Sequence, residues 1–162
     1  MPVTDITKDV ENRRLTITAE FAAPVERVWS LYEDARQLEQ VWGPPEYPAT
    51  FVSHELRPGS RSTYYMTSPE GERFGGYWDV TGVEAPGRFT FDDGFATAEL
   101  EPNPDLPVSH NTYTFEPTDG GTTATYTSTF ESAEALQKVL DMGMEEGSRS
   151  AIDQIDAFLA AG

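Results

Sequence analysis

The sequence predicts an α+β fold in which a curved antiparallel sheet wraps around a long C-terminal helix. Apolar and polar residues alternate with a period of two over most of residues 49–130, between short turns. Apolar residues with helical spacing occur in two places, over residues 25–42 and after residue 132. An order of strand, two short helices, several strands and a final helix is most simply satisfied by such a sheet, and 162 residues suit one core.

The N-terminal third begins with a polar segment and continues with one strand and two helices. Residues 1–12 predict a flexible N-terminal arm, and residues 13–162 predict a single domain. Residues 14–21 alternate between polar and apolar side chains, which is typical of a half-buried strand. Pro24 suits the first turn of a helix, whose apolar face comprises Val25, Val28, Trp29 and Tyr32. A second short helix is expected through residues 38–42, before Gly43-Pro44-Pro45.

The middle of the chain predicts the sheet. The candidate strands are residues 49–56, 60–67, 74–84, 88–92, 108–117 and 121–130. Turn residues such as Pro58-Gly59 and Pro86-Gly87 separate several of them, which favours antiparallel hairpins. Residues 92–107 contain three prolines and predict a long loop. In the last strand the threonines should face solvent, and the side chains expected to face inward are Ala124, Tyr126, Ser128 and Phe130.

The final helix should extend from its N-cap Ser132 to about residue 160. Its inward stripe has large residues at both ends, while the middle is occupied by Gly143, Gly147, Ser148 and Ala151. Glycine in a helix interior costs about 1 kcal/mol relative to alanine, so two such residues indicate a packing or functional requirement. We therefore expect this helix to leave a cavity between itself and the sheet.

Composition excludes several classes of function. The 28 acidic and 11 basic residues give a formal net charge of −17, which would repel phosphate backbones and anionic lipids, so neither nucleic acid nor membrane is expected as a partner. The absence of cysteine excludes disulfides, thiol nucleophiles and thiolate metal sites. The chain shows neither a signal peptide nor a long apolar run, so we expect a cytoplasmic protein. Its oligomeric state, monomer or homodimer, is left open.

Seven short motifs occur in a characteristic order over about residues 13–160. They are residues 21–29 (FAAPVERVW), 42–45 (WGPP), 54–60 (HELRPGS), 65–71 (YMTSPEG), 76–78 (GYW), 93–96 (DGFA) and 142–147 (MGMEEG). With them the chain resembles the SRPBCC superfamily, also called START-like or Bet v 1-like proteins, and within it the bacterial relatives of the activator of the heat-shock chaperone ATPase. This resemblance implies a helix-grip fold with a mostly apolar internal pocket and no universal activity. Ser60 and Ser148 depart from the family pattern, and Ser148 stands where a larger apolar residue is usual.

The leading hypothesis is a domain that binds a hydrophobic or aromatic small molecule in the internal cavity, without covalent catalysis or a cofactor. The candidate ligand-binding residues are Trp42, Tyr64, Met66, Phe74, Trp78, Phe91, Phe95, Tyr113, Tyr126, Met144, Gly147 and Ser148. Most are aromatic residues or methionines expected on inward strand faces, opposite the small residues of the helix. The competing interpretation is that they form an ordinary apolar core.

An alternative hypothesis is an enzyme of the cyclase or hydratase kind, in which His54, Asp93 or a pocket tyrosine acts as general acid–base. The simpler interpretations are that His54 orders the turn at Arg57-Pro58 and that Asp92-Asp93 belong to a turn before Gly94.

Other chemistries have little support in the sequence. The second histidine, His110, should be exposed, and no metal-ligand spacing is present. No phosphate-binding or dinucleotide-binding glycine motif occurs, which disfavours intrinsic ATP or nicotinamide chemistry. A third hypothesis, an interaction module for a chaperone, is implied by the family resemblance alone.

Overall fold

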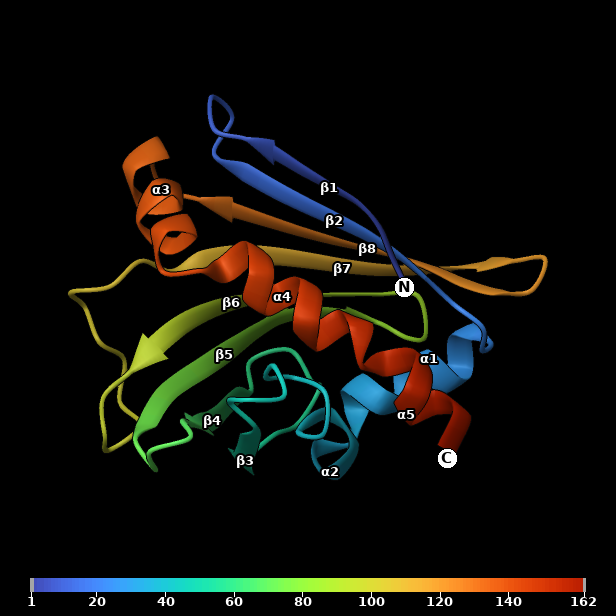
Figure 1. Ribbon diagram of the computed structural model, residues 1–162, viewed down its shortest axis with the longest axis horizontal. Coiled ribbons are helices and arrows are strands. Elements are labelled where there is room, and N and C mark those ends of the chain that lie inside the picture. The colour runs from blue at the N-terminus through green and yellow to red at the C-terminus, as the bar shows by residue number, and fades with distance from the viewer. Residues whose placement is uncertain (1, 162) are drawn as a thin grey trace.

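The computed structural model describes residues 2–161, and its strands form one curved antiparallel sheet (Figure 1). The strands are β1 (Val3–Asp9), β2 (Arg14–Phe21), β3 (Ala49–Ser53), β4 (Arg61–Thr67), β5 (Arg73–Glu84), β6 (Arg88–Ala96), β7 (Ser109–Thr118) and β8 (Gly121–Phe130). They are ordered β1-β2-β8-β7-β6-β5-β4-β3. Strands β3 to β6 follow one another in the sheet, β6 pairs with β7 of the β7–β8 hairpin, and β8 pairs with β2 of the N-terminal β1–β2 hairpin. The α+β class and the helix-grip architecture predicted from the sequence are confirmed.

Five helices accompany the sheet. They are α1 (Val25–Glu33), α2 (Ala35–Leu38), α3 (Ala133–Asp141), α4 (Met144–Asp153) and α5 (Ile155–Ala161). The first two connect β2 to β3, and α4 crosses in front of the sheet toward α1 (Figure 1). The side chain of Asp34 caps α2 by accepting hydrogen bonds from the backbone N–H groups of Arg36 and Gln37. Among residues 2–161, no helix has the length and apolar character needed to cross a membrane.

The N-terminal segment differs from its prediction, because residues 3–9 form the edge strand β1 instead of a flexible arm. They pair with β2 in antiparallel register, from Val3 opposite Ala19 to Asp9 opposite Arg14. The alternation in this segment is too weak to show in the sequence, and the backbone partners supplied by β2 decide its conformation. The two short helices consequently follow the second strand, not the first.

The final helix also differs from its prediction, because three helices replace the single helix expected over residues 133–160. The break between α3 and α4 lies at Gly143, whose φ of +91° is in the left-handed region that favours glycine. The Gly143 N–H donates to the carbonyl of Leu140 at 3.0 Å, which ends the last turn of α3. Gly143, one of the two central glycines, therefore allows the chain to change direction between α3 and α4.

The two glycines predict opposite effects of the same substitution. Gly143→Ala should lower the free energy of unfolding by about 1–2 kcal/mol, because a Cβ is strained at positive φ. Gly147→Ala, within α4 and with no atom within 4 Å of the new Cβ, should raise it by about 1 kcal/mol. Urea unfolding of both variants measures the difference. Equal effects of the two substitutions would contradict the assigned break.

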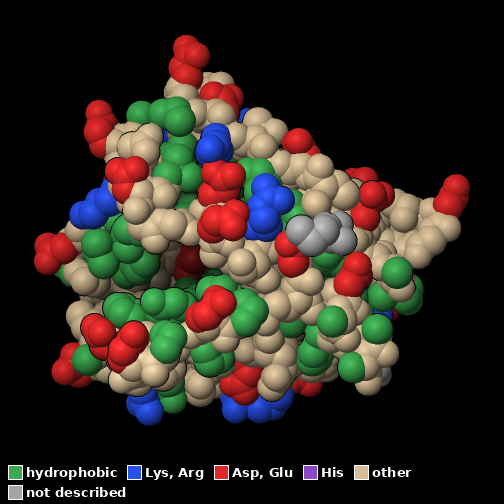
Figure 2. All heavy atoms as spheres, viewed as in Figure 1, with side chains coloured by type: hydrophobic (Ala, Val, Ile, Leu, Met, Phe, Trp, Pro, Cys, Tyr) green, Lys and Arg blue, Asp and Glu red, His purple; other side chains and the backbone are tan. Residues whose placement is uncertain are grey.

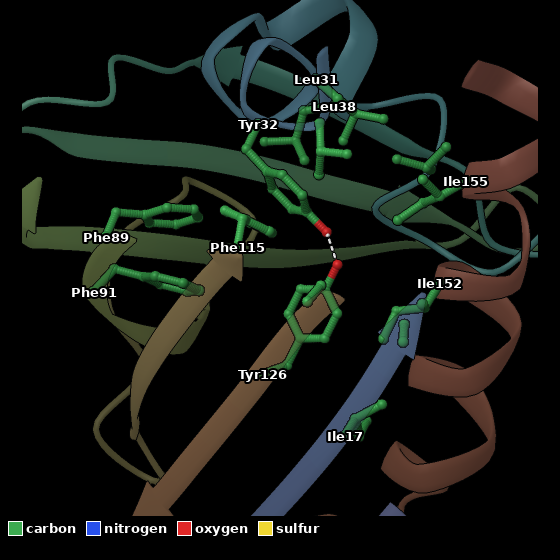
Figure 3. Close-up of a cluster of buried hydrophobic side chains, with 14 of the residues drawn as sticks. Ile17, Leu31, Tyr32, Leu38, Phe89, Phe91, Phe115, Tyr126, Ile152 and Ile155 are labelled. Carbon is green, nitrogen blue, oxygen red and sulfur yellow. Dashed lines mark hydrogen bonds between the residues drawn. The ribbon is translucent and has the colours of Figure 1, made fainter. Parts of the chain in front are cut away.

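The apolar core lies on the concave face of the sheet. Burial alternates along β8, with Ala124, Tyr126, Ser128 and Phe130 buried and the threonines between them half-buried, as the sequence predicts. The hydroxyl groups of Tyr32 and Tyr126 are 2.7 Å apart, and Figure 3 shows the two rings pointing toward each other amid aliphatic and phenylalanine side chains. This end of the concave face is densely filled.

Strand β6 is longer than predicted, because it continues to Ala96 through the segment expected to begin a loop. Asp92 and Asp93 are therefore strand residues, and the turn predicted for them is wrong. Asp93 pairs with Trp78 of β5 and Ser109 of β7. Pairing on both sides outweighs the local turn preference of Asp before Gly, and alternation then turns Asp93 to the face that carries Phe91.

Candidate functional site

Asp93 places a carboxyl group on the otherwise aromatic part of the concave face. Its Oδ1 accepts a hydrogen bond of 2.9 Å from the Tyr64 hydroxyl. Within residues 2–161 its Oδ2 has no hydrogen-bond partner, and the carboxyl forms no ion pair with any lysine or arginine. The sequence explains part of this isolation, since no basic residue occurs between Phe89 and Gln137.

Burial changes the protonation of this group. Desolvation raises the pKa of Asp93 from 3.8 to about 7, although the hydrogen bond from Tyr64 stabilises the carboxylate and lowers that pKa in part. Burial also raises the pKa of the Tyr64 hydroxyl well above 10, and the charge of Asp93 adds to this increase. At neutral pH, Tyr64 is therefore a hydrogen-bond donor and Asp93 is divided between its neutral and charged forms.

Aromatic rings surround the Asp93–Tyr64 pair. The Trp42 ring meets Tyr64 edge-on at 5.9 Å and Trp78 at 4.9 Å between centroids. The indole N–H groups of Trp42 and Trp78 are buried without a hydrogen-bond partner among the described residues. Both nitrogens are closed to solvent, so a molecule in an open hollow would meet the rings and not these N–H groups.

A chain of buried polar side chains leads from β8 to this pair. Ser128 Oγ donates to Asn111 Oδ1 at 2.6 Å, and Asn111 Nδ2 donates to Ser109 Oγ at 3.0 Å. Ser109 Oγ in turn donates to the backbone carbonyl of Asp93 at 3.4 Å. The sequence analysis did not propose Asn111 and Ser109, although they lie two and four residues before Tyr113 in β7, which places all three on one face.

The N-terminal half of α4 covers this region only thinly. None of residues 144–150 is buried, whereas Ala151 and Ile152 are. A Cβ built on Gly147 would meet no atom within 4 Å. Met144 and Ser148 share the helix face of the buried Ala151, so this half of the helix presents one flexible and one small side chain toward the sheet.

A hollow is visible beside this half of α4. Figure 2 shows hydrophobic side chains along part of its rim and an acidic side chain at its floor. Asp93 lies on the concave face of β6, where it is half-buried and bonded to the buried Tyr64. The helix does not fill the concave face here. The space is an open hollow, however, and not the enclosed cavity that the sequence predicts.

The predicted site residues separate into three groups. The aromatic cluster beside Asp93 contains Trp42, Tyr64, Trp78, Phe91 and Tyr113, and the partly buried residues packed against the core include Met66, Phe95 and Met144. Tyr126 belongs to the filled end of the core, where it bonds to Tyr32. Phe74 is wrong as a wall residue, because it lies at the end of the sheet beside Tyr47 and its side chain is 49 % exposed. The core interpretation thus holds for Tyr126 and also for Tyr64, Trp78 and Phe91, which are at most 6 % exposed. The partly exposed candidates are Trp42, Met66, Phe95, Tyr113 and Met144.

Both histidines have structural contacts. His54 Nε2 lies 2.7 Å from the carbonyl of Tyr32, which can only accept, so Nε2 carries the proton and Nδ1 accepts from Ser62 Oγ at 2.8 Å. Burial lowers the pKa of His54. His54 therefore joins β4 to α1 instead of ordering the turn at Arg57, and neither ring nitrogen is free for acid–base work. His110 is exposed as predicted, with its Nδ1 2.6 Å from Asp92.

Two further hollows lie away from Asp93. The larger, about 660 Å³, lies between the start of α1 and the β7–β8 turn, and its lining includes Pro24, Pro86 and Phe115. The other, about 450 Å³, adjoins His54 and Arg57. Within residues 2–161, no group of three or more potential ligands is arranged to hold a metal ion.

Comparison with protein families gives a match over most of the chain. The model of the Activator of Hsp90 ATPase homolog 1-like family matches residues 22–160. The chain belongs to this family. The motif resemblance is thereby confirmed, including residues 42–45 and 54–60, which supply Trp42 and His54. No curated protein sequence matches the chain.

Solved structures of other members of this fold are closely similar. A crystal structure of a Mycobacterium smegmatis protein shares 61 % identity, covers 99 % of both chains and has a TM-score of 0.92. A solution structure from Arthrobacter aurescens shares 50 % identity, covers 99 % of this chain and 93 % of the other, and has a TM-score of 0.94. One from Staphylococcus epidermidis, at 29 % identity, covers 98 % and 94 % with a TM-score of 0.84.

Proposed function

We propose that this family member binds an apolar or aromatic small molecule in the hollow between α4 and the concave face. The observation that carries the proposal is the open space beside residues 144–150, above a surface that combines aromatic rings with one carboxyl group. Binding sites for small molecules combine these features, a mostly apolar wall and a few polar groups that orient the ligand.

The polar groups would supply the orientation. Tyr64 and Asp93 form one hydrogen-bonded pair beside the Trp42 ring. Contact with the rings would supply the affinity, at about 25 cal/mol for each Å² of apolar surface removed from water. These features support a site that accepts an apolar body with at least one polar group.

Intrinsic fluorescence tests the proposal directly, because Trp42 and Trp78 lie at the site while Trp29 packs on Phe89 and Phe115. Titration with a panel of apolar and aromatic compounds should change tryptophan emission in a saturable manner. Calorimetry should give the same dissociation constant. A panel that gives no saturable signal by either method would contradict the proposal.

A substitution that fills the hollow should block binding. Ser148→Leu would project a larger side chain from the helix face that holds Ala151, so we expect at least a tenfold loss of affinity for any compound found in the panel. Ser150→Leu, on the opposite side of α4, is the matched control and should leave affinity within about twofold. Isothermal titration calorimetry measures both. Equal affinities of the two variants would place the binding site elsewhere.

Acid–base catalysis is a second candidate, because the pKa of Asp93 is raised to about 7 by burial. A carboxyl group with this pKa can both donate and accept a proton near neutral pH, as a cyclase or hydratase would require. His54 is not needed, since both of its nitrogens are engaged. Mass spectrometry of bound compounds distinguishes the two functions, because catalysis predicts a product that Asp93→Asn no longer forms.

A further inference from the structure

The carboxyl group of Asp93 lacks the cationic partner that a buried carboxylate ordinarily has. Its single hydrogen bond within residues 2–161 comes from the neutral Tyr64 hydroxyl. Buried charges in proteins are generally paired, since an isolated charge is costly in a medium of low polarity. Asp93 is only half-buried, so its carboxylate can be reached by a partner that comes from outside the chain.

The outer face of β4 and the adjacent strand β5 shows what completes such an arrangement in this molecule. There Arg61 lies over the Tyr77 ring, with Cζ 5.0 Å from the ring centroid, and forms two hydrogen bonds of 2.7 and 3.0 Å with Asp79. Arg73 lies over Tyr65 at 4.3 Å. On the outer face, a carboxylate and aromatic rings thus hold a cation between them. On the inner face, the carboxylate and the rings are present without the cation.

We infer that the hollow selects an organic cation, an ammonium group carried by an apolar or aromatic body, with the ammonium at Asp93 and the body against Trp42 and Tyr64. The inference rests on the proposed function and specifies its ligand class. Ring faces attract cations, a carboxylate pairs with them, and the net charge of −17 draws them toward the protein.

Ionisation of Asp93 governs the affinity for such a ligand. The titratable groups that face it are Tyr64 of β4 and Tyr113 of β7, and Tyr77 of β5 lies near; burial raises the pKa of each, so all three are neutral at pH 8. On α4, Glu145 is paired with Lys8, Glu146 with Arg149, and Asp153 accepts the backbone N–H of Val3. Asp93 is therefore the group that changes charge at the site between pH 5.5 and pH 8.

Three compounds of similar size test the charge preference: 4-phenylbutylamine, 4-phenylbutanol and 4-phenylbutyrate. Calorimetry at pH 8 should show the amine binding at least tenfold more tightly than the alcohol, and the acid binding most weakly. The amine keeps its charge down to pH 5.5, where a carboxyl of pKa about 7 is only about 3 % ionised. Its affinity should consequently fall by about 30-fold from pH 8 to pH 5.5, while that of the alcohol stays constant.

Substitution at Asp93 separates charge from shape. In Asp93→Asn the amine should lose both its advantage over the alcohol and its pH dependence, while the alcohol still binds. Asp92→Asn, on the outer face of β6, is the control and should retain the preference for the amine. Binding of the alcohol as tight as that of the amine at pH 8 would overturn the inference and leave the proposed function standing. Absence of binding by all three compounds would overturn the inference, whereas the proposed function is overturned only if the whole panel of apolar and aromatic compounds also fails to bind.

Discussion

Replacing Trp78 with alanine is expected to lower the free energy of unfolding by about 3–5 kcal/mol. The Trp78 side chain is 0 % exposed and is stacked on Phe91 at 4.2 Å between ring centroids. It also meets Trp42 and His54 edge-on at 4.9 and 5.4 Å. Truncation would remove all of these contacts and leave a void. The surrounding rings cannot easily fill this void, because they are already packed.

Phe74→Ala is the matched control, since Phe74 belongs to the same strand but is 49 % exposed at the end of the sheet. It should change the free energy of unfolding by less than about 1 kcal/mol. Urea unfolding followed by far-ultraviolet circular dichroism measures both variants, with the slope of the transition checked for constancy. A loss below about 1 kcal/mol for Trp78→Ala would show that the aromatic cluster is not packed as described.

The repeated local patterns of the sequence were sufficient to predict the sheet and its order of elements. Strand β8 is the clearest case, because a strict alternation of ten residues assigns each side chain to a face. Helix α1 is similar, since its apolar positions follow helical spacing after a proline. In both elements the local preference and the tertiary environment agree, so the sequence alone determines them.

The elements that were missed are those in which tertiary partners decide. Strand β1 has little alternation of its own and depends on the edge of β2. The turn preference of Asp93-Gly94 is overruled by pairing on both sides of β6. A glycine in a helical sequence can indicate either a helix break at positive φ or a helix face without bulky side chains. At Gly143 the φ of +91° shows that the first is the case, and the sequence alone does not distinguish them.

The candidate site was predicted in composition but not in its chemistry. The aromatic residues of the cluster follow from alternation in β4, β5, β6 and β7. The pairing of Asp93 with Tyr64 does not, because it joins residues 29 positions apart through the register of three strands. The raised pKa of Asp93 depends on the same register, since burial is its principal cause.

Asp93→Asn is expected to stabilise the protein at pH 8 by up to about 4 kcal/mol and to have little effect near pH 3.5. The pKa of Asp93 is 3.8 without its environment and about 7 in the folded protein. Each unit of this difference corresponds to about 1.4 kcal/mol. Because the folded pKa is the higher one, stability is fully present below pH 3.8 and is lost as the pH rises through 7. The asparagine carries no charge, so its variant avoids this loss.

The test is to measure the unfolding free energy of Asp93→Asn and of the parent protein in urea, at intervals from pH 4 to pH 8. The difference between the two should increase with pH. Subtraction removes the repulsion among the other acidic residues, which both proteins share. Asp92→Asn, whose carboxyl is on the outer face beside His110, should show no comparable rise in stability with pH. A difference that does not grow between pH 4 and pH 7 would contradict the raised pKa of Asp93. A carboxylate that lowers stability at neutral pH because it has no cationic partner is typical of a functional site, where binding of a ligand regains the lost stability.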